Sequence, residues 1–70
     1  MQNLELKIIQ NLKREVKEAG NESLLIIEAC KHRNLNATDL FERSVNINRR
    51  CHNMYDDLRY LEGEIKRLQI

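Results

Sequence analysis

Two short clusters of cysteine and histidine are the residues of this chain best suited to chemistry. Cys30 lies two residues before His32, and Cys51 directly precedes His52. Two thiolates and two imidazoles would suit a tetrahedral zinc site. Side chains one or two residues apart on a helix point in different directions, however, whereas zinc motifs use spacings that bring their ligands together. We therefore expect both cysteines to be reduced core residues, and we expect no metal and no other cofactor.

Acid–base or nucleophilic catalysis is the next chemistry to consider. His52 has Asp56 one helical turn away, but a general base also needs a pocket that holds a substrate. The sequence contains no serine–histidine–acid grouping and no glycine-rich phosphate loop. A chain of 70 residues is also short for enclosing a ligand pocket. We expect no catalytic residues and no small-molecule substrate, so an enzyme is not the predicted function.

The composition predicts a helical protein. There is no proline, there are only two glycines, and a third of the residues are charged. The net charge of +1 lacks the basic excess typical of dedicated nucleic-acid-binding domains. The longest apolar run, Leu24–Ile27, is far shorter than a membrane span. Met1 leads directly into a charged amphipathic segment without an export signal, so we expect a cytoplasmic protein without membrane contact.

The apolar spacing predicts a single all-α domain, residues 1–70, built from three helices. The expected helices span residues 4–19, 22–33 and 37–69. Gly20 fits a left-handed stop after the first helix, and Asn36 fits the cap of the third. One buried face is expected on the first helix, made by Leu4, Ile8, Ile9, Leu12, Val16 and Ala19.

The last segment carries a seam of residues that alternate three and four apart. Such a 3.5-residue period is typical of a coiled coil or a helical bundle. The seam consists of Ala37, Leu40, Ser44, Ile47, Cys51, Met54, Leu58, Leu61, Ile65 and Leu68. A second apolar strip beside it contains Phe41, Val45 and Tyr55. One strip can therefore hold the protein's own first two helices while the other holds a partner, and the alternative is a three-helix monomer.

Four charged residues beside the seam bear on how two such helices would pair. Arg43 and Arg50 lie in the first half of the segment, and Asp57 and Glu64 lie in the second half. An antiparallel pair would place Arg50 beside Asp57 and Arg43 beside Glu64, and such matches discriminate between orientations. The layers of that pair would be Cys51 on Met54, Ile47 on Leu58, Ser44 on Leu61 and Leu40 on Ile65.

We therefore hypothesise a small interaction protein or regulatory adaptor. It would act without chemistry, by forming a homodimer and by occluding or bridging another protein. The expected interface residues are Leu40, Ile47, Cys51, Met54, Leu58, Leu61, Ile65 and Leu68, flanked by Arg43, Arg50, Asp57 and Glu64.

The alternative is a small DNA-binding transcriptional regulator of the kind that phages and plasmids encode. A break at Val45–Ile47 would give a helix-turn-helix order, and the second helix would present base-reading side chains. Those side chains are Arg49, Arg50, Asn53 and Arg59. The segment Asn48–Glu62, which closes on Asp57-Leu58-Arg59-Tyr60-Leu61-Glu62, resembles the recognition helix of winged-helix regulators. That resemblance implies contact with nucleic acid.

Overall fold

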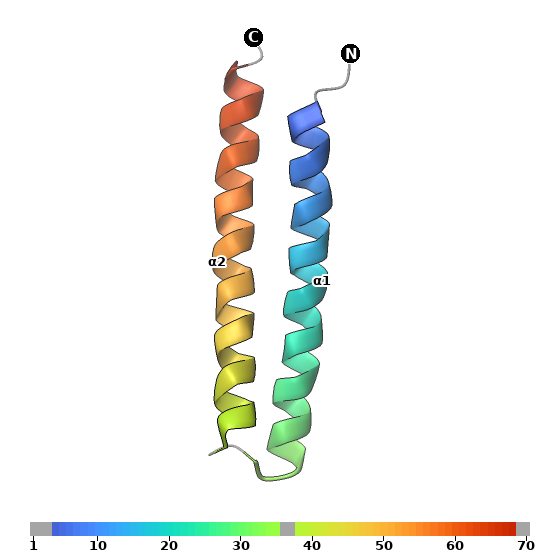
Figure 1. Ribbon diagram of the computed structural model, residues 1–70, viewed down its shortest axis with the longest axis vertical. Coiled ribbons are helices and arrows are strands. Elements are labelled where there is room, and N and C mark those ends of the chain that lie inside the picture. Colours follow the sequence, from blue (N-terminus) through green and yellow to red (C-terminus); the bar gives the residue numbers. More distant parts are fainter. Residues whose placement is uncertain (1–3, 36–37, 69–70) are drawn as a thin grey trace.

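The chain folds as a hairpin of two long antiparallel helices. The computed structural model describes residues 4–35 and 38–68, and these form α1 (Leu4–His32) and α2 (Asp39–Leu68). The two helices lie side by side along almost their whole length, so that the chain enters and leaves at the same end (Figure 1). The molecule is a thin rod of 53 × 15 × 12 Å. The prediction of an all-helical fold is confirmed.

The expected division of the first half into two helices is wrong, because α1 continues through Gly20 and Asn21. Gly20 has no positive φ, so it does not act as a left-handed stop. A glycine inside a helix costs about 1 kcal/mol relative to alanine. A Cβ atom at Gly20 would lie 3.5 Å from the Cβ of Cys51 on α2, which is an ordinary contact distance, so the two helices run close together here. The glycine marks a close approach of the helices and not a helix end.

The end of α1 is set by Asn34, which takes the left-handed role that the sequence suggested for Gly20. Its φ is +56°, a conformation that asparagine tolerates better than most residues. The amide of Leu35 donates to the carbonyl of Cys30 at 2.8 Å, and the amide of Asn34 donates to that of Lys31 at 3.2 Å. These are the two hydrogen bonds of a Schellman motif, which reverses the chain after a helix.

The start of α2 is capped by Thr38. Its hydroxyl oxygen accepts from the amide of Phe41 at 3.3 Å and donates to the carbonyl of Leu35 at 2.6 Å. Threonine commonly caps helices in this way, by satisfying an amide that lacks a partner within the helix. The cap predicted at Asn36 lies outside the described residues.

From its cap, α2 runs without interruption to Leu68. Residues 45–48 are helical, so the break required by the helix-turn-helix order is absent and that arrangement is wrong. Gly63 is helical too, and nothing lies within 4 Å of a Cβ built on it. In the described part of the chain, neither helix is long and apolar enough to cross a membrane.

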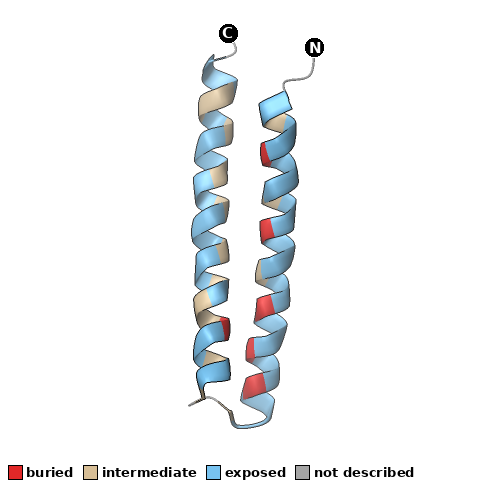
Figure 2. Ribbon diagram, in the orientation of Figure 1, coloured by how far each residue is buried: buried red, intermediate tan, exposed pale blue. Residues whose placement is uncertain are grey.

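The core is a narrow line between the helices, visible as the buried positions of α1 that face α2 (Figure 2). Four residues of α1 at seven-residue intervals form most of that line, namely Ile9, Val16, Ser23 and Cys30. Ile27 is buried beside them. From α2, Ser44 is buried, and half-buried residues complete the line: Val45, Asn48, Cys51, Tyr55, Leu58 and Ile65. The expected buried face of the first helix is therefore too broad, since only Ile9 and Val16 of its six members are buried.

A polar layer fixes the middle of this core. Asn48 donates from Nδ2 to the carbonyl of Gly20 at 3.0 Å and to Oγ of Ser23 at 3.1 Å. Ser23 itself donates to the same carbonyl at 2.7 Å. These bonds join the helices at a single level, because sliding α2 by one turn would leave buried polar groups without partners.

Candidate interaction surface

Ala37 of the predicted seam lies outside the described residues, and the other nine seam residues divide into two sets in the folded chain. Ser44, Cys51, Leu58 and Ile65 are buried or half-buried toward α1. The other half is exposed, with 47% to 75% of each residue accessible to solvent. It consists of Leu40, Ile47, Met54, Leu61 and Leu68, one residue in every seven. Hence half of the predicted seam serves the hairpin itself, and the other half is an exposed apolar strip beside its core.

The first helix carries a matching strip that the sequence analysis missed. Leu12, Ala19 and Ile26 recur at seven-residue intervals and are exposed, as is Ile8 one turn earlier. Leu12, Ala19 and Ile26 each lie one turn before a buried residue of α1. In the same way, Leu40, Ile47, Met54 and Leu61 each lie one turn before an inward residue of α2. In antiparallel helices, positions with this same offset fall on one side of the hairpin. The signal in the sequence was this heptad spacing, which runs uninterrupted across Gly20.

The levels of the two helices align the two strips. Ser23 contacts Asn48, and Gly20 lies against Cys51. Counting outward from those contacts places Leu12 near the level of Leu61, and Ile26 near that of Ile47. We call the combined surface the apolar face, and its residues are Ile8, Leu12, Ala19, Ile26, Leu40, Ile47, Met54, Leu61 and Leu68.

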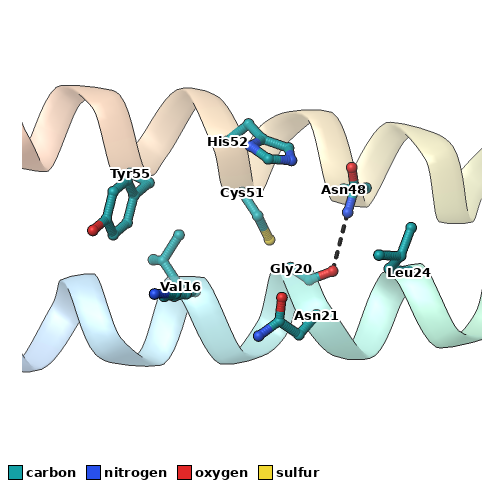
Figure 3. Close-up of a pocket in the computed structure, with 9 residues that line it drawn as sticks. Val16, Gly20, Asn21, Leu24, Asn48, Cys51, His52 and Tyr55 are labelled. Carbon is teal, nitrogen blue, oxygen red and sulfur yellow. Dashed lines mark hydrogen bonds between the residues drawn. The ribbon is translucent and has the colours of Figure 1, made fainter.

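The opposite side of the hairpin is hollowed. A groove of about 350 Å³ crosses both helices there, and Figure 3 shows it between Val16, Gly20 and Leu24 on α1 and Cys51, His52 and Tyr55 on α2. Its other lining residues are Lys17, Asn21 and Asn48. Gly20 lines it without contributing a side chain. Two of its lining residues are Leu24 on α1 and His52 on α2. Leu24 lies five residues after Ala19 of the apolar face, and His52 lies five residues after Ile47 of that face. The equal spacing agrees with the apolar face and the groove lying on opposite sides of the hairpin.

The groove offers little for chemistry. His52 is exposed at its rim, and the lining residues include no carboxylate that would orient the imidazole. Cys30 is buried in the core and Cys51 is half-buried, both as free thiols. Among residues 4–35 and 38–68, no three histidine, cysteine, aspartate or glutamate side chains are grouped so as to hold a metal ion.

One ion pair joins the helices away from the polar layer. Lys13 Nζ lies 3.1 Å from Glu62 Oε1, with both side chains mostly covered, and 5.5 Å above the ring of Tyr55. The hydrogen bond from Lys13, its positive charge and that of Lys66 together lower the pKa of the Glu62 carboxyl, although partial burial opposes them. Lys13 thus binds two groups of α2 from a single position on α1.

The four charged residues predicted to flank an interface lie along the outer border of the apolar strip. Each follows a strip residue by three positions, so that Arg43, Arg50, Asp57 and Glu64 line the edge of α2 away from α1. Arg43 and Arg50 also line a shallow hollow next to Ile47. Glu64 pairs with Arg67 on its own helix, in an exposed contact.

The residues predicted to contact DNA do not form a recognition helix behind a turn. Arg49, Arg50, Asn53 and Arg59 are all exposed on α2. Helical geometry spreads them around its outer surface, from the border of the apolar strip to the groove side. Arg49, Arg50 and Asn53 lie on the outer side of α2, whereas Arg59 lies toward the groove side.

The amount of exposed surface is high for the size of the chain. A folded monomer of 8.4 kDa is expected to expose about 4,600 Å². This chain exposes 5867 Å², roughly a quarter more than that.

No family model matches the chain, and no curated protein or solved structure is significantly similar to it. The basis for assigning a function is therefore the geometry of the hairpin and its apolar face.

Proposed function

We propose that this protein is an interaction module that acts by self-association through its apolar face and by occluding or bridging another protein, without catalysis. The observation that carries the proposal is the strip of large apolar side chains on α2, one per heptad and each about half exposed or more. Large contiguous apolar patches on small proteins mark contact sites. A strip with this spacing fits the seam of another helix.

The energetics of burial favour association of two copies. Fully burying a leucine, isoleucine or methionine side chain contributes roughly 1.5–3 kcal/mol, and a half-exposed one about half of that. Summed over the apolar faces of two copies, this gain offsets the roughly 4–15 kcal/mol lost in translational and rotational freedom. The product would be a four-helix bundle, the usual solution for amphipathic helices that expose one stripe.

Substitution of Leu61 by glutamate tests the proposal, with Leu25 as a matched control. Both leucines are exposed, but Leu25, at 70% exposure, lies on the side of α1 facing away from α2. We expect the wild-type protein to have twice the chain mass in light scattering with reductant across a wide concentration range. Leu61→Glu should shift the mass to the monomer with helix content retained, because it places a charge in the interface, and Leu25→Glu should remain dimeric.

Three outcomes would contradict the proposal. The first is a wild-type mass equal to one chain at every concentration. The second is an equal shift toward the monomer in both variants, which would indicate a nonspecific effect of the added charge. The third is global unfolding of Leu61→Glu in circular dichroism while Leu25→Glu stays folded, which would assign the strip to the protein's own core.

A further inference from the structure

We infer that the apolar strip of α2 packs on the same strip of a second copy of this chain, antiparallel, with the two-fold axis at Met54. This inference rests on the proposed function and specifies its partner and geometry. It differs from the arrangement expected from the sequence alone. Each layer expected from the sequence paired an exposed strip residue with a residue that α1 covers in the hairpin, so those layers cannot form between two copies. The covered residues are Ser44, Cys51, Leu58 and Ile65.

The first argument is the symmetry of the strip itself. Five apolar residues at equal intervals have Met54 at their centre. When two copies run antiparallel about Met54, Ile47 of one lies level with Leu61 of the other, and Leu40 lies level with Leu68. Every layer then contains two apolar residues, and both copies contribute the same surface, as a two-fold contact requires.

The second argument is charge complementarity along the border of the strip. Arg43 and Arg50 precede the centre, and Asp57 and Glu64 follow it at separations that differ from theirs by one residue. Antiparallel pairing about Met54 brings Arg50 level with Asp57 of the other copy, and Arg43 level with Glu64. All four border charges of each copy then have an opposite partner. Glu64 exchanges its exposed contact with Arg67 for this one, at little cost because such exposed pairs contribute little stability.

The third argument is the shape of the border. The hollow beside Ile47 is lined by Arg43 and Arg50, and also by Asp39, Glu42 and Asn46, where the strip passes the first half of α2. In the antiparallel pair, this hollow faces Leu61 of the other copy, with Asp57 and Glu64 of that copy at its edge. Leu61 of one copy thus meets Ile47 beside the hollow of the other, and Asp57 and Glu64 meet Arg50 and Arg43 at its edge.

Other arrangements of two copies lack this match. A parallel pair of α2 helices would place like charges at the same level. A pair with its two-fold axis along the rod would place α2 against α1 of the other copy. In that pair Arg50 would lie level with Glu22, but Asp57 would lie level with Glu15 and repel it. The antiparallel arrangement also brings Glu15 level with Glu22 of the other copy, but the opposite pairs made by all four border charges of α2 outnumber this repulsive contact.

Charge reversal tests the orientation directly. One variant carries Arg43→Glu with Arg50→Glu, and the other carries Asp57→Arg with Glu64→Arg. Each variant alone sets like charges against each other, and we expect its dimer to dissociate roughly tenfold more readily than wild type at low salt. An equimolar mixture restores every opposite pair, so it should form a heterodimer about as stable as the wild-type dimer. The recovery should diminish at high salt, because exposed charges are screened.

The matched control carries Arg49→Glu with Arg59→Glu, which changes the net charge of α2 by the same amount on surfaces away from the strip. This control should retain the wild-type dissociation constant in sedimentation. The antiparallel pairing is overturned if the wild type is a dimer but the two charge variants dissociate no more readily than wild type. It is also overturned if their mixture forms no stable heterodimer. In both cases the proposed self-association is unaffected. A wild-type monomer would instead remove the proposed function itself.

Disulfide trapping provides a second measurement should the charge variants fold poorly. The background carries Cys30→Ala and Cys51→Ala, with its helix content checked by circular dichroism. Met54→Cys should then form a disulfide-linked dimer on mild oxidation, because the two-fold axis brings the residue against itself. Ile47→Cys and Leu61→Cys should crosslink with each other when mixed, and neither should crosslink efficiently alone. Crosslinking of all three positions alone would show a parallel pair and overturn the inference.

Discussion

At the scale of single residues, Asn48 and Gly20 set how the two helices meet. The Asn48 amide reaches the Gly20 carbonyl and the Ser23 hydroxyl, so one side chain of α2 fixes the level of α1. A buried polar side chain of this kind specifies register in paired helices, because any other alignment leaves it without partners. Gly20 lies close to α2 at this level, where a Cβ atom would be in ordinary contact with the Cβ of Cys51.

Replacement of each glycine by alanine tests whether α1 is continuous. We expect Gly20→Ala to raise the free energy of unfolding by about 0.5–1 kcal/mol, because alanine is the better helix former and its Cβ would meet Cys51 at an ordinary contact distance. Gly63→Ala, with open space around it, serves as the reference and should give a similar gain. Urea unfolding at a fixed protein concentration measures both. Destabilisation by Gly20→Ala alone would indicate a left-handed stop at that position.

The sequence did not reveal the role of Gly20, for a physical reason. A glycine followed by asparagine after an amphipathic segment is the usual pattern of a helix end, and local propensity favours that interpretation. Tertiary packing decided otherwise, through a contact with Cys51, which lies far away along the chain. Asn34, an asparagine in a polar stretch, supplied the left-handed residue that the chain needed.

At the scale of the helices, α2 has two adjacent apolar sides: one packs on α1 and the other is exposed. One side contributes Cys51, Leu58 and Ile65 to the hairpin, and the other presents the apolar strip. The ion pair of Lys13 with Glu62 ties α1 to the C-terminal half of α2, beyond the polar layer around Asn48. Stability of that half should therefore depend on the charge of Glu62.

The pH dependence of unfolding tests this ion pair. Because the pKa of Glu62 is lowered in the folded protein, the pair adds stability above the ordinary carboxyl pKa. That contribution is lost as the pH falls through the lowered pKa of the folded state. We expect Glu62→Gln to be less stable than wild type near neutral pH and to show a shallower loss of stability on acidification. Glu18→Gln, at an exposed position of α1, controls for the change in net charge, and an equally shallow profile there would contradict the prediction.

The sequence predicted the long C-terminal helix and its heptad spacing but not which residues remain exposed. A 3.5-residue period identifies the full set of seam positions, and it does not show which of them the protein's own chain covers. That division depends on the side from which α1 approaches, and α1 was expected as two shorter helices. The matching strip of Leu12, Ala19 and Ile26 was overlooked for the same reason.

At the scale of the whole molecule, the hairpin is a rod that is several times longer than it is wide. A shape of this kind leaves much of its side-chain surface in water, which agrees with the large exposed area. Two rods that pack side by side bury far more surface than two rods that meet at their ends. The position of the apolar face along the length of the rod, and not at its tip, favours the lateral arrangement.

Small-angle X-ray scattering distinguishes these arrangements. We expect particles of twice the chain mass whose maximum dimension remains close to the 53 Å length of one hairpin, with a thicker cross-section. The reason is that antiparallel pairing about Met54, near the middle of the rod, superimposes the two lengths. A maximum dimension approaching twice that length would show end-to-end assembly. Leu61→Glu should return the profile to that of the thin single rod.

The placement of the chain ends has a consequence for any such pair. The first residue of α1 and the last residue of α2 lie at the same end of the rod (Figure 1). An antiparallel pair therefore directs both ends of one copy to one pole and both ends of the other copy to the opposite pole. A peptide or domain fused to either terminus would be displayed twice, once at each pole, at a separation of about one rod length. The pair would then hold the two identical fused groups apart at a fixed separation.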